Sequence, residues 1–159
     1  MSRLKAVLFD AGNTIVHVNH EEVRRICGER GHSCTVEHLQ AAELRARRKL
    51  DTPAHFARTN DASRWFEYYG EILDRVGIPR ALLHDLHEHH ARSNLWSVLP
   101  ADVPPALDLL RRRFRLGVVS NANGTVAGVF GRLGIADRFE TIAKVAFELP
   151  DDVIQAVLE

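Results

Sequence analysis

The sequence predicts an α/β fold, in which a Rossmann-like core with a parallel sheet carries an inserted α-helical cap domain. Three apolar segments, residues 6–9, 116–121 and 141–145, have the length of buried strands and alternate with helical patterns. The first two segments end abruptly in polar residues, as strands do where a parallel sheet displays functional groups. A block of predicted helices separates the first strand from the second, which indicates a domain inserted into the core.

The length and composition of the chain fit this organisation. Its 159 residues, 45% of them hydrophobic, can form one core of ordinary size, or a small core with a helical appendage. We assign the α/β core to residues 1–16 and 97–159 and the cap to residues 17–96. The core is expected to be discontinuous and incomplete, with three strands present and others missing.

Charge and hydropathy exclude several classes of protein. Twenty-one Lys and Arg residues balance twenty-one Asp and Glu residues, so no net field attracts nucleic acid or an anionic membrane. No apolar run approaches the roughly 20 residues that span a bilayer, and the N-terminus lacks the pattern of a signal peptide. We expect a cytoplasmic protein with no nucleic-acid or membrane partner. Cys27 and Cys34 lack a second pair to complete a zinc site and are expected to be reduced.

The first strand leads into the segment around which the chain is organised. The apolar run at residues 6–9 ends in Asp10 and continues through Gly12 and Asn13, a pattern typical of a buried strand followed by a loop. A carboxylate at this position can attack phosphorus or bind a metal ion. On this segment alone, an Asp that only caps a turn is the alternative.

The predicted cap consists of four helices. Asn19 and Thr35 are N-cap residues of the first two helices. The third helix begins at Asp61, after a linker over residues 53–60. Pro79 stands in the first turn of the fourth helix, where its missing N–H is not needed.

Two polar clusters lie in the predicted cap. One is a basic run that comprises Arg45, Arg47, Arg48 and Lys49. The other is a set of histidines in the fourth helix that comprises His84, His87, His89 and His90. We interpret the basic run as solvent-exposed surface, with an anion site as the alternative. The histidines do not match the HExxH pattern, so an exposed polar face is favoured over a metal site.

The second half of the chain alternates helices and strands. A helical stripe over residues 103–114 leads into the second strand, whose last residues are Ser120 and Asn121. The elements that follow are a helix over residues 126–133 ended by Gly134, a strand over 141–145 and a last helix capped by Asp151 or Asp152.

The two strand ends carry motifs of a known family. Asp10, Gly12 and Thr14 follow the first strand, while the second strand ends in residues 118–120 (Val-Val-Ser), with Asn121 after it. With the helical block between them, these motifs resemble those of the haloacid dehalogenase superfamily, in particular its phosphatase-like members with an α-helical cap of the C1 type. The first family motif is Asp-x-Asp-x-Thr or a variant after an apolar strand, and the second is an apolar strand that ends in Ser or Thr.

The resemblance implies hydrolysis of a phosphoric monoester of a small metabolite, with Mg²⁺ as cofactor and an aspartyl-phosphate intermediate. Asp10 would be the nucleophile and a metal ligand, and the backbone carbonyl of Gly12 would be a second metal ligand. Ser120 and its neighbouring amides would bind the transferring phosphoryl oxygens. The implied phosphate-binding residues are Asn13, Thr14, Ser120 and Asn121.

The chain departs from the family pattern at three places. Gly12 stands where most phosphatases of the family have an acid/base Asp, whose assistance is worth about 10² to 10⁴ in rate. Leu149 stands where the third motif has Lys, and Lys144 is the nearby substitute. The acidic fourth motif is absent. An impaired enzyme is therefore expected, and the alternative is a non-catalytic relative that binds a phosphorylated ligand or a protein partner.

Comparison with the family's sheet indicates that strands are missing beside residues 6–9. In that sheet the first strand is central, so residues 6–9 would present an uncovered apolar edge here. We expect either a truncated or frameshifted product, or an oligomer in which another chain closes the edge. A third hypothesis is an unrelated helical interaction domain, in which Asp10 and Ser120 are only polar residues at strand ends.

Overall fold

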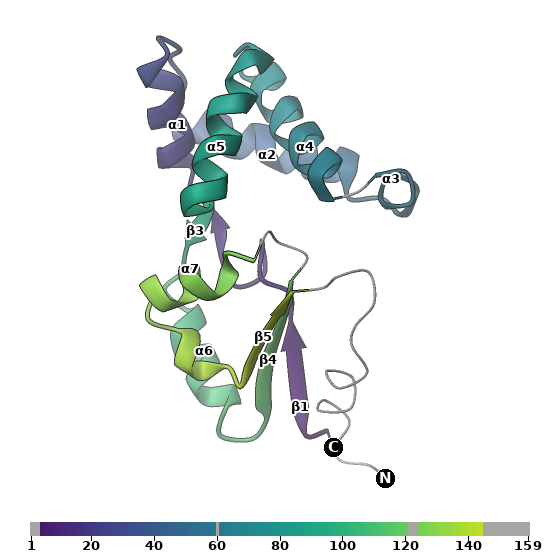
Figure 1. Ribbon diagram of the computed structural model, residues 1–159, viewed down its shortest axis with the longest axis vertical. Helices are drawn as coiled ribbons and strands as arrows, with labels where there is room; N and C mark the ends of the chain where they lie inside the picture. The colour runs from purple at the N-terminus through teal and green to yellow at the C-terminus, as the bar shows by residue number, and fades with distance from the viewer. Residues whose placement is uncertain (1–3, 60, 121–123, 145–159) are drawn as a thin grey trace. The chain divides into compact units, whose positions relative to one another are not determined.

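The computed structural model describes three stretches of the chain, residues 4–59, 61–120 and 124–144. They divide into two compact units (Figure 1), a core unit of Met1–Val18 with Trp96–Glu159 and a helical unit of Asn19–Leu95. The cap predicted from the sequence begins two residues before the helical unit and ends one residue after it. The predicted final helix lies outside the described residues.

The core unit contains a parallel three-stranded sheet in the order β1-β4-β5. Its strands are β1 Ala6–Phe9, β4 Arg115–Ser120 and β5 Thr141–Lys144. Phe9 pairs with Val118 and Ser120 pairs with Lys144, so the carboxyl ends of the three strands meet at one edge. The predicted α/β class and the three predicted strands are confirmed.

Two helices, α6 Val103–Leu110 and α7 Val126–Arg132, connect these strands. The chain moves in one direction across the sheet, so right-handed crossovers place both helices on the same face (Figure 1). Val118 and Phe130 are fully buried in the resulting core, and burial of a side chain of this kind contributes about 1.5–3 kcal/mol. Parallel sheets are commonly covered by helices on both faces. Among the described residues one face is covered, and Leu8 is 40% exposed.

A second, two-stranded sheet lies where the chain leaves and re-enters the core unit. It pairs β2 His17–Val18 with β3 Trp96–Val98 in antiparallel fashion. The sequence does not predict β3, because a strand of three residues is too short for its hydrophobic alternation to be recognised.

The helical unit contains α1 His20–Glu29, α2 Val36–Leu50, α3 Pro53–Phe56, α4 Asp61–Arg75, the 3₁₀ turn η1 Arg80–Leu82 and α5 Leu83–Ser93. The two predicted N-caps are confirmed. The Asn19 side chain accepts a hydrogen bond from the N–H of Glu22 at 3.1 Å, and the Thr35 hydroxyl accepts one from the N–H of His38 at 3.2 Å. None of the helices in the described ranges is long and apolar enough to span a membrane.

The prediction of a linker over residues 53–60 is wrong for its first half, which forms the one-turn helix α3. Thr52 caps this helix by accepting a hydrogen bond from the N–H of His55 at 3.2 Å, and Pro53 occupies the first turn. Thr52 and Pro53 therefore start a helix within a segment whose composition is typical of a loop.

Candidate active site

Three predicted site residues, Asp10, Ser120 and Lys144, lie at the carboxyl edge of the parallel sheet. Asp10 follows directly after β1, and Ser120 is the last residue of β4. Because Phe9 pairs with Val118, Asp10 lies one residue past this pair, as Val119 does on β4. The structure therefore brings Asp10 and Ser120 to the same end of neighbouring strands. Lys144 ends β5 and is the register partner of Ser120.

Asp10 has a carboxyl group that is less acidic than that of an ordinary Asp. The residue is exposed overall, but partial burial of its carboxyl group raises its pKa from the usual value of 3.8. Hydrogen bonds from the backbone N–H of Ala11 and from the Thr14 side chain oppose this shift, because they stabilise the carboxylate. Thr14 thus contacts the group that the sequence proposes as nucleophile.

The loop after Asp10 is held in place by its own backbone. The carbonyl of Ala11 accepts hydrogen bonds from the N–H groups of Ile15 and Val16 at 2.9 and 3.0 Å. The N–H of Asn13, which adopts a left-handed conformation with φ 58°, donates to the carbonyl of Val16 at 2.7 Å. Ala11, Ile15 and Val16 are buried and anchor the loop in the core. The loop is therefore a fixed turn that presents Asp10 and Gly12 at the edge.

The donor atoms of this turn fit a cation that keeps most of its water. In the described part of the chain, no group of three or more His, Cys, Asp and Glu side chains could hold a metal ion. The turn offers the Asp10 carboxylate, and the buried Asn13 Oδ1 has no hydrogen-bond donor among the described residues. Mg²⁺ commonly binds proteins through one or two carboxylates and completes its shell with water. The residues present thus suit Mg²⁺ better than a metal that needs several side-chain ligands.

Gly12 lies beside the indole ring of Trp96. A Cβ atom at this position would lie 3.5 Å from Cδ1 and from Nε1 of Trp96, the first residue of β3. The Trp96 ring packs against the buried residues of the core unit. The missing side chain at position 12 is visible in the sequence, but the indole beside it is not, because the two residues are far apart in the chain.

The structure describes only some of the other predicted site residues. Ser120 is 5% exposed, so its side chain lies within the edge of the sheet. Asn121, predicted to bind phosphate, and Leu149, at the position of the motif Lys, lie outside the described residues. Lys144 is placed by its backbone, at the end of the strand next to Ser120.

The prediction of an exposed histidine face in the cap is wrong for His90. Only 7% of this residue is exposed, and its Nδ1 accepts a hydrogen bond from the N–H of Leu95 at 3.1 Å. Its ring stacks on Trp65 of α4 at 5.5 Å, and His87 contacts the same indole edge-on at 4.9 Å. Burial, together with the charges of His87 and His89, lowers the pKa of His90 to about 4. These histidines therefore serve the packing of α5 against α4.

A buried polar cluster in the helical unit went unrecognised in the sequence. Glu43 of α2 is 9% exposed, and its carboxylate lies 2.8 Å from Nε2 of His20 and accepts a hydrogen bond from the Tyr68 hydroxyl at 2.5 Å. Burial alone would raise the pKa of Glu43, but the contacts with His20 and Tyr68 lower it below its usual value. The only sequence signal is a carboxylate on the apolar face of α2.

Comparisons with known proteins agree with this architecture. No protein-family model and no curated protein sequence matches the chain. Among solved structures, the HAD-hydrolase YfnB from Bacillus subtilis, bound to magnesium, matches with a TM-score of 0.63 and 16% identity over 90% of this chain and 66% of that chain. A haloacid dehalogenase-like hydrolase from Streptococcus pneumoniae matches with a TM-score of 0.52 and 16% identity over 98% and 69% of the two chains.

A third structure, from Lactobacillus delbrueckii subsp. bulgaricus and described as a phosphoglycolate phosphatase, matches with a TM-score of 0.51 and 18% identity. The match covers 99% of this chain and 73% of the Lactobacillus chain. The chain thus spans only about two thirds of the length of the first of these proteins, 66% of YfnB. The likeness confirms the predicted fold class, a Rossmann-like core with an inserted helical cap.

Proposed function

Because the chain has the fold of the haloacid dehalogenase superfamily of hydrolases, we propose that it is a phosphatase-like hydrolase that cleaves a small phosphorylated metabolite with Asp10 as nucleophile. The supporting observation is the placement of Asp10 and Ser120 at the same carboxyl edge of the parallel sheet. Ligands of open α/β sheets bind at this edge. The Thr14 hydroxyl, which hydrogen-bonds to Asp10, holds the carboxylate in position.

In the proposed reaction, a carboxylate oxygen of Asp10 forms a bond to phosphorus while the ester P–O bond breaks. The departing oxygen keeps the electron pair and takes a proton from water. A second water then attacks phosphorus, passes its proton to solvent and releases inorganic phosphate, which restores the carboxylate. Covalent catalysis of this kind divides one difficult hydrolysis into two easier steps. Ser120 is the group we assign to bind a phosphoryl oxygen.

The Asp10 carboxylate and the backbone carbonyl of Gly12 would hold Mg²⁺, with water as the remaining ligands. When bound, the ion supplies positive charge that lowers the repulsion between the carboxylate and the phosphate. Lys144, at the end of the strand beside Ser120, is our candidate for a further positive charge. Gly12 carries no proton donor, so we expect the enzyme to prefer esters whose leaving group departs without protonation.

A second candidate function is binding of a phosphorylated ligand without turnover. The observation that favours it is that position 12 has no acid/base side chain and lies beside the indole of Trp96, which carries no acid/base group either. A site of this kind would still offer Ser120 and the turn after Asp10 to a phosphate group.

The test measures phosphate release from an activated aryl phosphate in the presence of Mg²⁺. Asp10→Asn should reduce release to background, and Ser120→Ala should reduce it strongly. Asp102→Asn, which changes an exposed carboxylate of the core unit, is the matched control and should keep full activity. Equal release by the parent and Asp10→Asn would contradict the proposal. No release, combined with Mg²⁺-dependent thermal stabilisation by phosphate that Asp10→Asn loses, would support the second candidate.

A further inference from the structure

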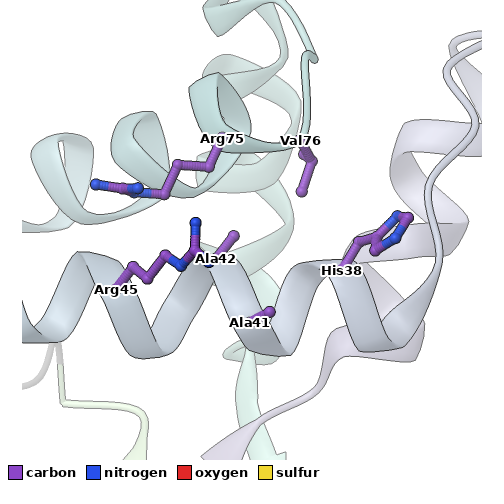
Figure 2. A pocket seen from close by; sticks show the side chains of 6 residues that line it. All are labelled: His38, Ala41, Ala42, Arg45, Arg75 and Val76. Carbon is purple, nitrogen blue, oxygen red and sulfur yellow. The ribbon is translucent and has the colours of Figure 1, made fainter.

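The helical unit contains a pocket between α2 and α4 that is separate from the residues assigned above. Its volume is about 340 Å³, at the lower end of the range for small-molecule sites. Six side chains line it (Figure 2): His38, Ala41, Ala42, Arg45, Arg75 and Val76. Ala41 and Ala42 leave open space on α2, and the side chains of Arg45 and Arg75 extend into the gap between the helices.

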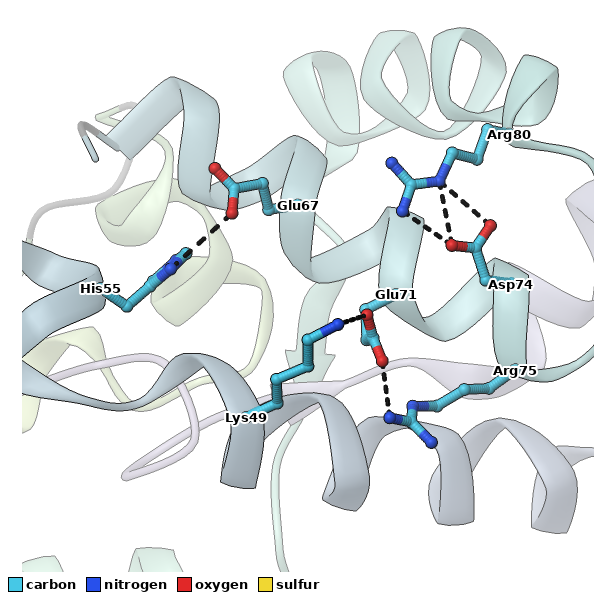
Figure 3. A network of polar contacts seen from close by, with 7 residues as sticks. All are labelled: Lys49, His55, Glu67, Glu71, Asp74, Arg75 and Arg80. Carbon is cyan, nitrogen blue, oxygen red and sulfur yellow. Dashed lines mark hydrogen bonds and ion pairs between the residues drawn. The ribbon is translucent and has the colours of Figure 1, made fainter. Parts of the chain in front are cut away.

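An ion-pair network fixes one end of this pocket (Figure 3). Lys49 Nζ lies 2.6 Å from Oε2 of Glu71, and Arg75 Nη2 lies 2.6 Å from Oε1 of the same carboxylate. Both oxygens of Glu71 are thus engaged, and the hydrogen bond from Lys49 is the main cause that lowers the pKa of Glu71. The network holds the Arg75 side chain along the groove between α2 and α4.

One turn before Lys49 on α2, Arg45 lacks an acidic partner of the kind that Glu71 provides for Lys49 among the described residues. Arg45 precedes Lys49 by four residues, so both project from the same face of α2. Lys49 meets Glu71 of α4, whereas Arg45 shares the pocket with Arg75. Within the described ranges, Arg45 has no ion-pair partner, and the carboxylate beside Arg75 is already shared with Lys49. Lys49 and Arg75 therefore share the Glu71 carboxylate, and Arg45 contacts no carboxylate in the described part of the chain.

Arg45 and Arg75 are exposed to solvent at the pocket, and an anion that enters it would contact two positive charges. Guanidinium groups present several N–H donors in a fixed plane, and this arrangement matches the oxygens of a phosphate group. His38 at the pocket wall adds a further N–H donor, while Ala41, Ala42 and Val76 offer apolar surface to the rest of a ligand.

We propose that this pocket is a binding site for the phosphate group of a small molecule, held by Arg45 and Arg75. It is distinct from the phosphate chemistry proposed at Asp10, because all its lining residues belong to the helical unit. The sequence predicts an exposed surface for the basic run at residues 45–49. Arg45, Arg48 and Lys49 are exposed, as predicted, and our proposal adds an anion-binding role for Arg45.

The test uses the full chain with both Asp10→Asn and Ser120→Ala, in EDTA and without Mg²⁺, so that the nucleophile, the assigned phosphate-binding hydroxyl and the ion are all removed from the proposed catalytic site. Inorganic phosphate is titrated by calorimetry, and ionic strength is held constant with chloride. In this background Arg45→Gln should weaken phosphate binding about tenfold or more, the loss expected for a charged hydrogen-bonded contact. Arg48→Gln removes the same charge from an exposed position of α2 outside the pocket and should change affinity less than about twofold.

A second variant separates the pocket from surface charge. Ala41→Leu places a larger side chain in the cavity at an exposed position, so it should abolish phosphate binding without changing the net charge or the melting temperature. Absence of binding at millimolar phosphate, equal losses in Arg45→Gln and Arg48→Gln, or undiminished binding in Ala41→Leu would each overturn the proposal. A failure here leaves the hydrolase proposal intact, because that proposal is tested by Mg²⁺-dependent turnover.

Discussion

Trp96 lies beside Gly12: a Cβ atom at position 12 would lie 3.5 Å from both Cδ1 and Nε1 of the indole. This is an ordinary van der Waals contact, so a small side chain fits there, whereas atoms beyond Cβ must turn away from the ring. The contact links the turn after the proposed nucleophile to β3, where the chain re-enters the core unit. A side chain introduced at position 12 would therefore pack against the indole.

Gly12→Asp tests whether the missing proton donor limits turnover. If the carboxyl group reaches the leaving oxygen, the ratio of kcat/KM for an aryl phosphate to that for an alkyl phosphate should fall at least about tenfold, since acid assistance is worth about 10² to 10⁴ for poor leaving groups. Gly12→Ala is the matched control, because it adds the same contact with Trp96 without a proton donor, and its ratio should stay unchanged. An equal change in both variants would show that packing against the indole, and not proton transfer, sets the preference.

Thr14 is expected to affect the pH at which kcat/KM falls on the acidic side of its pH profile. Partial burial raises the pKa of Asp10, and the Thr14 hydrogen bond opposes the rise. The nucleophile must be ionised, so kcat/KM should fall as pH decreases through the pKa of Asp10. Thr14→Val removes the hydrogen bond and should shift the acid limb to higher pH, whereas Thr14→Ser should leave it in place. A limb that does not move in Thr14→Val would mean that another group titrates.

The sequence was most informative where a structure depends on close neighbours in the chain. Asn19 and Thr35 cap their helices through side chain to backbone bonds that span three residues, and both were predicted. The parallel strands were also predicted, because a buried strand is a short apolar run and its polar end is visible in the sequence. The resemblance to a family added the expectation that Asp10 and Ser120 lie together.

Features that depend on distant partners could not be predicted. The strand β3 exists because Trp96 and Val98 pair with β2, about 80 residues earlier in the chain. The burial of His90 depends on Trp65 from another helix, so the histidine spacing alone indicated an exposed face. Likewise, the contact of Trp96 with position 12 has no local signal. In each case the deciding contact joins segments whose spacing carries no periodic pattern.

The buried carboxylate of Glu43 should make Tyr68 important for stability. Tyr68 donates a hydrogen bond to Glu43 at 2.5 Å, and His20 contacts the other oxygen at 2.8 Å. Tyr68→Phe leaves a buried carboxylate with one partner fewer, so the free energy of unfolding should fall by about 1–3 kcal/mol in urea titrations. The effect should shrink in a Glu43→Gln background, because the two residues act through one contact. Additive losses would contradict a direct coupling.

Tyr68→Phe should also change how stability responds to acid. The contacts with His20 and Tyr68 hold the pKa of Glu43 below its usual value in the folded protein. Their contribution is therefore present above the pKa of Glu in the unfolded chain and is lost as pH falls through the folded pKa. Without the Tyr68 hydroxyl the folded pKa rises, so acid destabilisation by this group should diminish. An unchanged acid dependence would show that Tyr68 does not set the pKa.

His90 should make the helical unit sensitive to mild acid. Its buried imidazole has a pKa of about 4, whereas an unfolded histidine titrates near about 6.5. Between these values the unfolded chain binds a proton that the folded protein excludes, so the free energy of unfolding should fall as pH decreases through this window. The full effect is about 3 kcal/mol. Urea titrations across the window measure the slope.

The matched variants compare two histidines of α5. His90→Gln cannot titrate and keeps an oxygen that can accept the hydrogen bond from Leu95, so the pH slope should flatten even if the variant is less stable throughout. His84→Gln changes an exposed histidine and should keep the slope of the parent protein. The comparison uses slopes and not absolute stabilities, so a general loss of packing against Trp65 does not obscure it. A slope that persists in His90→Gln would assign the acid sensitivity to another buried group.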